Sequence, residues 1–244
     1  MLLFACKIWY LSLIHISKKF NISCICEVRD LWPETLVQYG RLKKESVFAK
    51  LLYFGEKMIY IKANALIFTM EGGVDYIKEK GWERNVPESK IFHINNGIDL
   101  DEFDINCKKF ILDNQNLDNR KKYKIIYTGA INPVNNLNII VNVARQLKIY
   151  TDIVFLIWGN GIELDILKKR VEELKLNNII FEGRVEKRYI PGILVRGDLN
   201  LVHWEMSELL KYGCSYNKSV SYTHLLEKSV IRIVHRHKTP ERRV

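Results

Sequence analysis

The residues best suited to chemistry follow the apolar segments that predict strands. These segments begin near Lys124, Asp152, Asn178 and Asp198, and each ends in glycines or a small polar cluster. The clusters are Gly129, Gly159 to Gly161, Gly183 to Lys187, and the loop from Ser215 to Lys218. Strands that alternate with helices of about ten to fifteen residues predict a parallel sheet covered on both faces. Since ligands of such sheets bind at the carboxyl ends of the strands, we expect the function to reside there.

Amphipathic segments between these strands predict the helices that would hold the edge in place. One segment has helical spacing from Ile162 to Leu174, with an apolar face of Ile162, Ile166, Leu167, Val171 and Leu174. The intervals match a helix period, so this face should pack on the sheet.

The preceding part of the chain has the same alternation. A strand from Ile22 to Val28 ends at the polar pair Arg29 and Asp30. A long helix over Glu45 to Lys62 follows, with a predicted buried side of Phe48, Leu51, Leu52, Met58 and Ile59. Glu34 and Glu56 are predicted to be solvated. A polar, turn-rich stretch then predicts a domain over residues 1–106, a linker over 107–122 and a second domain over 123–244.

Composition narrows the class of ligand. The 244 residues carry a formal net charge of +10, which favours polyanions such as phosphorylated substrates, anionic lipids or nucleic acid. Because the lysines are scattered and not clustered with aromatics, nucleic-acid binding is not expected. The cysteines and histidines show no metal-ligand spacing, so no metal is expected, and the odd cysteine count suits a reducing cytosol. Gly159 and Gly161 lack the third glycine of a dinucleotide fingerprint, which disfavours NAD.

Six short motifs occur in a set order: EVRDLWPETL, NNGIDLDEF, YTGA, WGNG, FEGRVEKRYIP and KYGCSYNK. Each motif alone is weak, since such turns are common. Together, from about Lys18 to Lys218, they resemble the retaining GT-B glycosyltransferases of family 4, especially the branch that builds bacterial capsule and O-antigen repeats. The resemblance implies an α/β, GT-B-like fold with two Rossmann-like parallel-sheet domains facing a cleft, both incomplete in this chain.

The resemblance also implies a site for a nucleoside-diphosphate sugar in the second domain. Main chain at Gly183, Arg184 and Val185 would hold the nucleobase, and Lys187 the ribose or phosphates. The remaining implied binding residues lie in turns near the nucleotide and its diphosphate: Gly129, Ala130, Gly159, Gly161, Asn217 and Lys218. The alternative is that the glycines form ordinary tight turns and the cations are solvated.

Arg29 and Asp30 stand where related enzymes place a catalytic histidine or polar group. The resemblance implies that Arg29 holds acceptor or leaving phosphates and that Asp30 orients an acceptor hydroxyl. The alternative is a structural Arg–Asp pair that caps the next helix.

The pattern breaks at the C-terminal end, where Ser221 stands at a position that is acidic in the family and Leu226 where glycine is expected. A single nucleotide string, CTGTCTCTTATACACATCT, encodes Leu11 to Ile16 in one frame and Val220 to Leu225 in another. It resembles a transposon end used in sequencing libraries. We therefore interpret residues 1–16 and 220–244 as non-native, with both stretches being genuine as the alternative.

The expected activity is transfer of a hexosyl or N-acetylhexosaminyl group, with retention, from a nucleoside-diphosphate sugar. UDP is the expected nucleotide, the acceptor is a lipid-linked molecule or a glycan, and the pathway is bacterial surface polysaccharide synthesis. No cofactor is expected. The enzyme would be cytoplasmic, with peripheral contact to an anionic membrane at its inner face. The alternative is an inactive nucleotide-binding fragment of such an enzyme.

Overall fold

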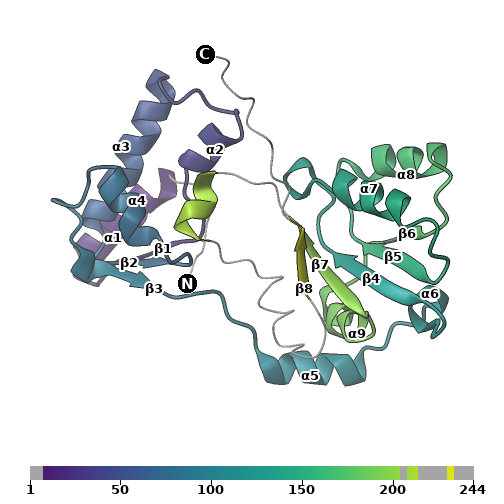
Figure 1. Cartoon of the computed structure of the whole chain (residues 1–244). Helices are drawn as coiled ribbons and strands as arrows, with labels where there is room; N and C mark the ends of the chain where they lie inside the picture. Colours follow the sequence, from purple (N-terminus) through teal and green to yellow (C-terminus); the bar gives the residue numbers. More distant parts are fainter. Residues whose placement is uncertain (1–7, 204–207, 214–229, 234–244) are drawn as a thin grey trace, which may run out of the picture. The chain divides into compact units, whose positions relative to one another are not determined.

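A computed structural model describes residues 8–203, 208–213 and 230–233 (Figure 1). The described chain forms two compact units, one from residues up to Asn96 together with the segment around Tyr212, the other from Gly97 onward. Each unit has a parallel sheet of its own, so the α/β class expected from the sequence is confirmed.

The first unit is built on three parallel strands in the order β1-β2-β3. They are β1 (Ile25–Val28), β2 (Ala65–Phe68) and β3 (Ile91–His93). The helices between and around them are α1 (Ile8–Phe20), α2 (Glu34–Gln38), α3 (Val47–Lys62) and α4 (Gly73–Glu79), with the 3-10 turn η1 (Glu88–Lys90). Ser46 begins α3 as its N-cap, because its hydroxyl accepts a hydrogen bond from the Ala49 N–H at 3.1 Å.

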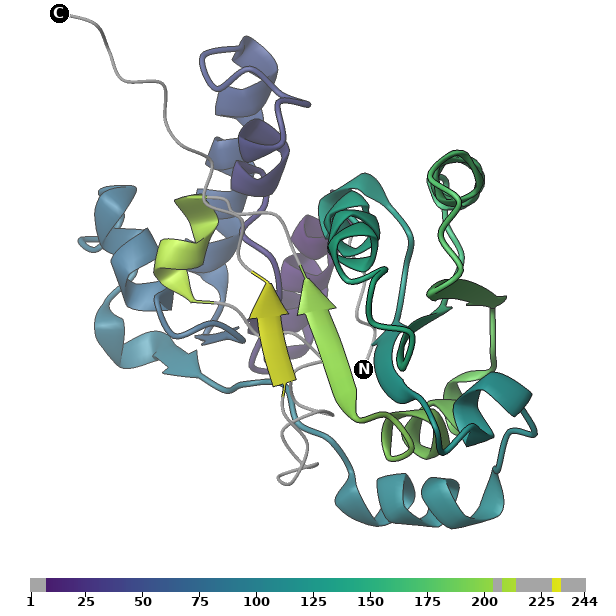
Figure 2. The same ribbon diagram turned by 45° about the vertical axis from the view of Figure 1, so that its right-hand side comes forward.

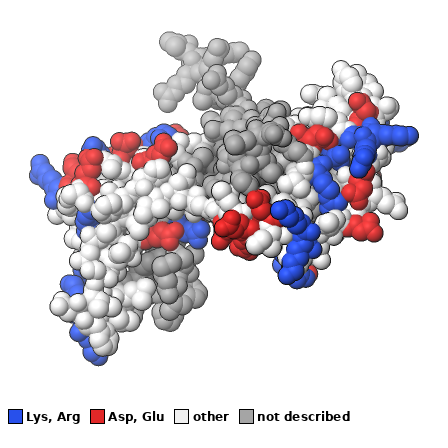
Figure 3. Space-filling view, turned by 90° about the horizontal axis from the view of Figure 1, so that it is seen from below, with Lys and Arg blue, Asp and Glu red and all other residues white. Residues whose placement is uncertain are grey.

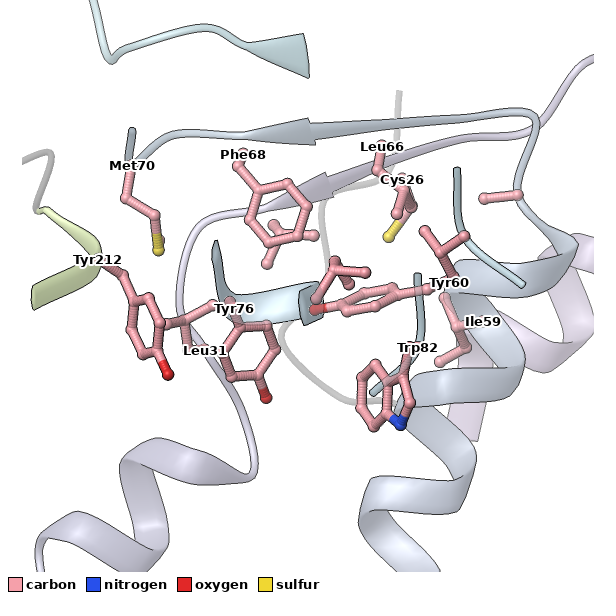
Figure 4. Close-up of a cluster of buried hydrophobic side chains, with 14 of the residues drawn as sticks. Cys26, Leu31, Ile59, Tyr60, Leu66, Phe68, Met70, Tyr76, Trp82 and Tyr212 are labelled. Atoms are coloured by element: carbon pink, nitrogen blue, oxygen red, sulfur yellow. The ribbon is translucent and has the colours of Figure 1, made fainter. Parts of the chain in front are cut away.

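Aromatic side chains form much of this unit's core (Figure 4). Tyr60 meets Phe68 and Trp82 edge to face, with ring centroids 5.9 and 6.0 Å apart. Tyr76 packs in the same way against Tyr212, at 5.3 Å. Edge-to-face pairs match the positive edge of one ring with the negative face of another, which stabilises the core beyond simple area burial.

Tyr212 belongs to a segment that returns from far along the sequence. The turn η4 (Glu208–Tyr212) packs on α4, and the Gly72 N–H donates to the Tyr212 carbonyl oxygen at 2.7 Å. A Cβ on Gly72 would lie 2.5 Å from the Tyr212 Cα, so this contact requires glycine. The ammonium group of Lys211 adds an ion pair to Glu79 at 2.6 Å.

The second unit contains a five-stranded parallel sheet in the order β6-β5-β4-β7-β8. Its strands are β4 (Tyr123–Thr128), β5 (Ile153–Trp158), β6 (Ile179–Gly183), β7 (Leu199–His203) and β8 (Val230–Ile233). Its helices are α5 (Leu100–Lys109), α6 (Gln115–Asp118), α7 (Asn138–Gln146), α8 (Leu164–Glu173) and α9 (Ile190–Leu194), with the 3-10 turns η2 (Pro133–Asn135) and η3 (Lys187–Tyr189).

Both faces of this sheet are covered. Figures 1 and 2 show α7 and α8 on one face, and α9 on the other with α5 beside it. Alternate strand residues accordingly enter two cores: Ile125 and Tyr127 join α7 and α8, whereas Ile126, fully buried as well, points to the opposite face. Burial on both faces explains why the strands read as continuous apolar runs.

Two helix faces differ from their prediction. On α3, Phe48 and Leu51 are each 61% exposed, whereas Ile59 is buried as expected. On α8, Leu167 and Val171 are buried, but Ile166 is 65% exposed because the helix presents a narrower stripe to the sheet than its apolar spacing suggests. Apolar periodicity gives the face of a helix but not the width of the surface that covers it.

The prediction that Glu34 and Glu56 are solvated is wrong. Both are buried, at 6% and 3% exposure. The Glu34 carboxylate accepts hydrogen bonds from the Tyr53 hydroxyl at 2.6 Å and from the Lys80 ammonium. The Glu56 carboxylate accepts from the hydroxyls of Tyr60 and Tyr76, at 2.8 and 3.0 Å. These partners satisfy carboxylates that burial alone would destabilise.

The segment expected to be a linker, residues 107–122, contains the end of α5 and all of α6. Phe103 of α5 and Leu117 near α6's end are buried, and α5 packs on α9, so these helices group with the second unit. The expected domain limits stay a prediction.

One face of the described surface has mixed charge. On the face drawn in Figure 3, Lys and Arg side chains lie in separate groups interspersed with Asp and Glu. Among the described residues, no helix is both long and apolar enough to cross a membrane.

Candidate functional site

A pocket of about 700 Å³ lies at the carboxyl ends of β4, β5 and β6 in the second unit. Its lining comes from the end of β5, from the segments that follow the three strands and from the start of α9, namely Gly129, Ala130, Trp158, Gly159, Asn160, Arg184, Val185, Glu186, Lys187 and Ile190. Six of the sequence-predicted binding residues are among them: Gly129, Ala130, Gly159, Arg184, Val185 and Lys187. The parallel sheet brings them together because its strands all end at one edge.

The loop after β4 is held in place by hydrogen bonds to its main chain. The Gly129 N–H donates to the Trp158 carbonyl oxygen at 2.9 Å. The Ala130 carbonyl oxygen accepts from the Tyr127 hydroxyl and from the Asn135 side-chain amide, each at 2.9 Å. The main-chain N–H of Ala130, by contrast, has no hydrogen-bond partner among the described residues.

The loop after β5 packs directly on the loop after β4. A Cβ on Gly159 would lie 1.9 Å from the Gly129 carbonyl oxygen, and one on Gly161 would lie 2.2 Å from that of Ile131. Only glycine permits so close an approach of two main chains. The Ile131 N–H donates to the Asn160 carbonyl oxygen at 2.9 Å, and the Gly159 N–H to that of Gly183 at 2.8 Å. Gly161 therefore shapes the pocket without lining it.

The loop after β6 supplies the charge. Gly183 has a φ of +80°, which suits glycine, and turns the chain so that Arg184 and Lys187 reach the pocket. Glu186 also lines it, but its carboxylate pairs with Arg188 at 2.9 Å. Within the described part of the chain, no ion pair involves Arg184 or Lys187. The pocket therefore presents two uncompensated cations, which suit an anionic ligand.

Some lining residues were not singled out from the sequence. Trp158 and Asn160 flank Gly159 within the WGNG motif, and Ile190 begins α9. Trp158 is an apolar residue at the end of a buried strand, so its type and position suggested only a core residue.

Arg29 and Asp30 lie at the carboxyl end of β1 in the first unit. Arg29 does not pair with Asp30: its guanidinium lies 3.6 Å from the Glu27 carboxylate and donates to the Asn96 side chain at 3.4 Å. No side chain caps the start of α2. The structural alternative, an Arg–Asp pair capping the next helix, is therefore wrong, and both residues remain exposed at the edge of the sheet.

Asn217 and Lys218 lie outside the described residues, as do Ser221 and Leu226. Their expected roles stay predictions. Among the described residues, no cluster of His, Cys, Asp or Glu could hold a metal ion.

Solved structures share this fold at low sequence identity. HepE from Anabaena, in complex with UDP and glucose, matches with a TM-score of 0.66 at 14% identity, over 93% of this chain and 57% of its own. TarM from S. aureus gives 0.53 at 16% identity, over 89% and 39%. WaaG, a glycosyltransferase involved in lipopolysaccharide biosynthesis, gives 0.58 at 11%, over 92% and 68%. The chain thus spans little more than half the length of HepE. No curated protein matches the chain.

The fold of the chain matches that of these GT-B glycosyltransferase neighbours. The chain covers only part of the length of each neighbour. A family model matches part of the second unit. Residues 108–203, which run from the end of α5 through β7 and include the whole pocket, match the family described as glycosyl transferases group 1.

Proposed function

We propose that the pocket of the second unit binds the diphosphate end of a nucleoside-diphosphate sugar and that the chain transfers this sugar to an acceptor. The observation that carries the proposal is the convergence of Arg184, Lys187 and the glycine-containing loops at one pocket inside the matched segment. UDP is the proposed nucleotide, because HepE was solved with UDP and with UDP-glucose.

The residues present suit the departure of a diphosphate. As the bond to the sugar breaks, negative charge grows on the leaving phosphate, and preorganised cations and N–H groups stabilise it. Arg184 and Lys187 supply the cations. The main-chain N–H groups of Ala130 and Asn160 supply donors, since neither has a partner among the described residues. The N–H groups of Gly129 and Gly159 are already used within the protein. These two glycines thus act through their lack of a side chain.

The finer assignments rest on the motif resemblance. They are membership of family 4, retention of configuration, a hexosyl or N-acetylhexosaminyl donor, and a lipid-linked or glycan acceptor in bacterial surface polysaccharide synthesis at the inner face of the membrane. WaaG, which is involved in lipopolysaccharide biosynthesis, supports this direction. Arg29 and Asp30 are the proposed acceptor-side residues, and their exposure at the end of β1 supports an encounter with substrate. Asn217 and Lys218 are proposed to add to the diphosphate site.

Calorimetric titration with UDP, GDP and ADP tests the proposal. UDP should bind, and Arg184→Ala or Lys187→Ala should weaken binding roughly 10- to 100-fold each, since a hydrogen bond to a charged group contributes roughly 1.5–3 kcal/mol. Lys168→Ala is a matched control, because Lys168 is exposed on α8 and does not line the pocket. Equal UDP affinity in all variants would remove the pocket from consideration. UDP binding without sugar transfer would instead identify an inactive nucleotide-binding chain.

A further inference from the structure

An acidic side chain lies in the lining of the otherwise cationic pocket. Of the described residues that line it, Glu186 alone is acidic, and it directly precedes the cation Lys187. A carboxylate next to a diphosphate would repel it, since both carry negative charge. Glu186 therefore suits a part of the ligand other than the phosphates.

The local fold leaves much of this carboxylate unused. Glu186 is the N-cap residue of η3, but its side chain does not cap the turn, and the Tyr189 N–H donates to its main-chain oxygen at 3.0 Å instead. Among the described residues, the partner of the carboxylate is Arg188, whose Nη2 lies 3.0 Å from Oε1 and 2.9 Å from Oε2. A carboxylate has roughly four acceptor sites, so about two remain for donors of a ligand.

Two aromatic rings hold Arg188 in place. The centre of its guanidinium lies 5.0 Å from the centroid of the Phe110 ring and 5.5 Å from that of Tyr189. The two rings also meet edge to face, with centroids 5.8 Å apart. A guanidinium is attracted to aromatic faces at such distances, which restricts its position. Arg188 therefore fixes the Glu186 carboxylate at the pocket from outside the lining.

The chemistry of a carboxylate identifies the ligand group that it would meet. A carboxylate only accepts hydrogen bonds, and the donors of UDP are the two ribose hydroxyls and the N3–H of uracil. The N3–H lies between two carbonyl oxygens, which would repel a carboxylate brought up to it. The neighbouring 2′ and 3′ hydroxyls can instead each donate to one carboxylate oxygen. A carboxylate accepts from a ribose hydroxyl in the same way in dinucleotide sites at the ends of parallel strands.

We propose that the Glu186 carboxylate accepts hydrogen bonds from the ribose hydroxyls of the bound nucleotide, and that Arg188 is its positioning residue. The pocket thereby selects ribonucleotides over deoxyribonucleotides. This inference rests on the proposed function, which it deepens by naming the group that reads the sugar of the nucleoside.

Calorimetric titration of the full chain with UDP, 2′-deoxyUDP and 2′,3′-dideoxyUDP tests the proposal. The unchanged chain should bind UDP at least on the order of 10-fold more tightly than the dideoxy analogue, which lacks both hydroxyl donors to the charged carboxylate. Glu186→Ala should bind UDP and the dideoxy analogue equally. Glu186→Gln should keep part of the preference, because its amide retains one acceptor oxygen.

Variants of Arg188 separate positioning from general stability. Arg188→Ala should lower the preference for UDP while leaving the affinity for the dideoxy analogue unchanged, whereas a damaged fold would weaken both. Arg188→Lys keeps a cation beside the carboxylate and should restore part of the preference. Glu172→Ala is the matched control, because it removes an exposed acid at the end of α8 that does not line the pocket. Exposed ion pairs contribute little to stability, so all these variants should fold.

Equal affinity of the unchanged chain for UDP and its dideoxy analogue would overturn the ribose assignment and leave the nucleotide site standing. An equal change in affinity for both ligands in Glu186→Ala would also overturn it. If both bound more tightly to that variant, the carboxylate would lie beside the phosphates. No binding of UDP by the unchanged chain would instead remove the proposed function, and this inference with it.

Discussion

The Nδ1 atom of His203, at the end of β7, lies 2.7 Å from the main-chain oxygen of Asn135. A carbonyl oxygen only accepts, so Nδ1 carries the proton and donates. The side-chain amide of Asn135 in turn donates to the Ala130 carbonyl oxygen at 2.9 Å. A hydrogen-bonded path therefore links the buried end of β7 to a loop that lines the pocket.

Breaking this path should loosen the loop without removing any group that touches the ligand. His203→Phe keeps a ring of similar size but leaves the Asn135 oxygen without its donor, which should cost about 1–3 kcal/mol of stability. We expect UDP affinity to fall several-fold in His203→Phe and in Asn135→Ala, measured by calorimetry. Asn142→Ala is the control, since its side chain bonds Arg170 between α7 and α8, away from the pocket lining. The same loss of affinity in all three variants would refute the path.

The two glycines of the loop after β5 should not tolerate a methyl group. Gly159→Ala and Gly161→Ala place a Cβ within 2.2 Å of a main-chain oxygen, so the β4 and β5 loops must separate. We expect a loss of at least ~2 kcal/mol in the free energy of unfolding, measured by urea denaturation. Gly55→Ala, within α3, meets no atom within 4 Å and should instead stabilise the protein by about 0.5–1 kcal/mol. A destabilisation equal to that of Gly159→Ala would show that main-chain contact is not the cause.

The Glu34–Lys80 pair should make stability depend on pH. Burial would raise the pKa of Glu34, but hydrogen bonds from Lys80 and Tyr53 and the charge of Lys80 together lower it below its ordinary value of 4.5. A lowered pKa stabilises the folded state above the unfolded value, and this stabilisation is lost as the pH falls through the lowered value. Thermal unfolding of the unchanged protein should therefore show stability falling below pH 4.5.

Removal of one partner distinguishes this pair from a surface ion pair. Lys80→Met leaves a buried carboxylate without its cation and should cost about 3–5 kcal/mol at neutral pH. The deficit should shrink in acid, where Glu34 becomes protonated. The double variant Glu34→Gln with Lys80→Met should be more stable than Lys80→Met alone. If the stability loss of the double variant equalled the sum of the losses in Glu34→Gln and in Lys80→Met, a direct interaction between the two side chains would be contradicted.

Arg29 and Asp30 should affect turnover and not donor binding. Arg29→Ala and Asp30→Asn alter exposed groups at the end of β1, so both variants should fold normally. We expect kcat for sugar transfer to fall about 100-fold or more, the size usual for a positioned acid–base group, with UDP affinity unchanged. Arg84→Ala is an exposed arginine control in the same unit. Full activity in both site variants would exclude them from the chemistry.

Much of the second unit could be read from the sequence because its signals are local. Apolar runs of strand length, helical spacing between them and glycines after them require no knowledge of distant partners. A parallel sheet then brings Gly129, Gly159 and Arg184 to one edge, whatever the details of packing. Motif order pointed to the glycosyltransferase class for the same reason, since short motifs are also local features of the sequence.

Tertiary structure alone decided which polar and apolar side chains are buried. Glu34 and Glu56 can be buried because Lys80 and Tyr76, which lie 46 and 20 residues further along the chain, donate hydrogen bonds to their carboxylates. The sequence near each glutamate does not reveal these distant partners. The exposure of Phe48 and Leu51 depends on which face of α3 meets the sheet. Likewise, the contact of Tyr212 with Gly72 depends on a segment returning across more than half the chain. Local sequence sets backbone preference and periodicity, whereas burial is a property of surfaces that meet only when the chain has folded.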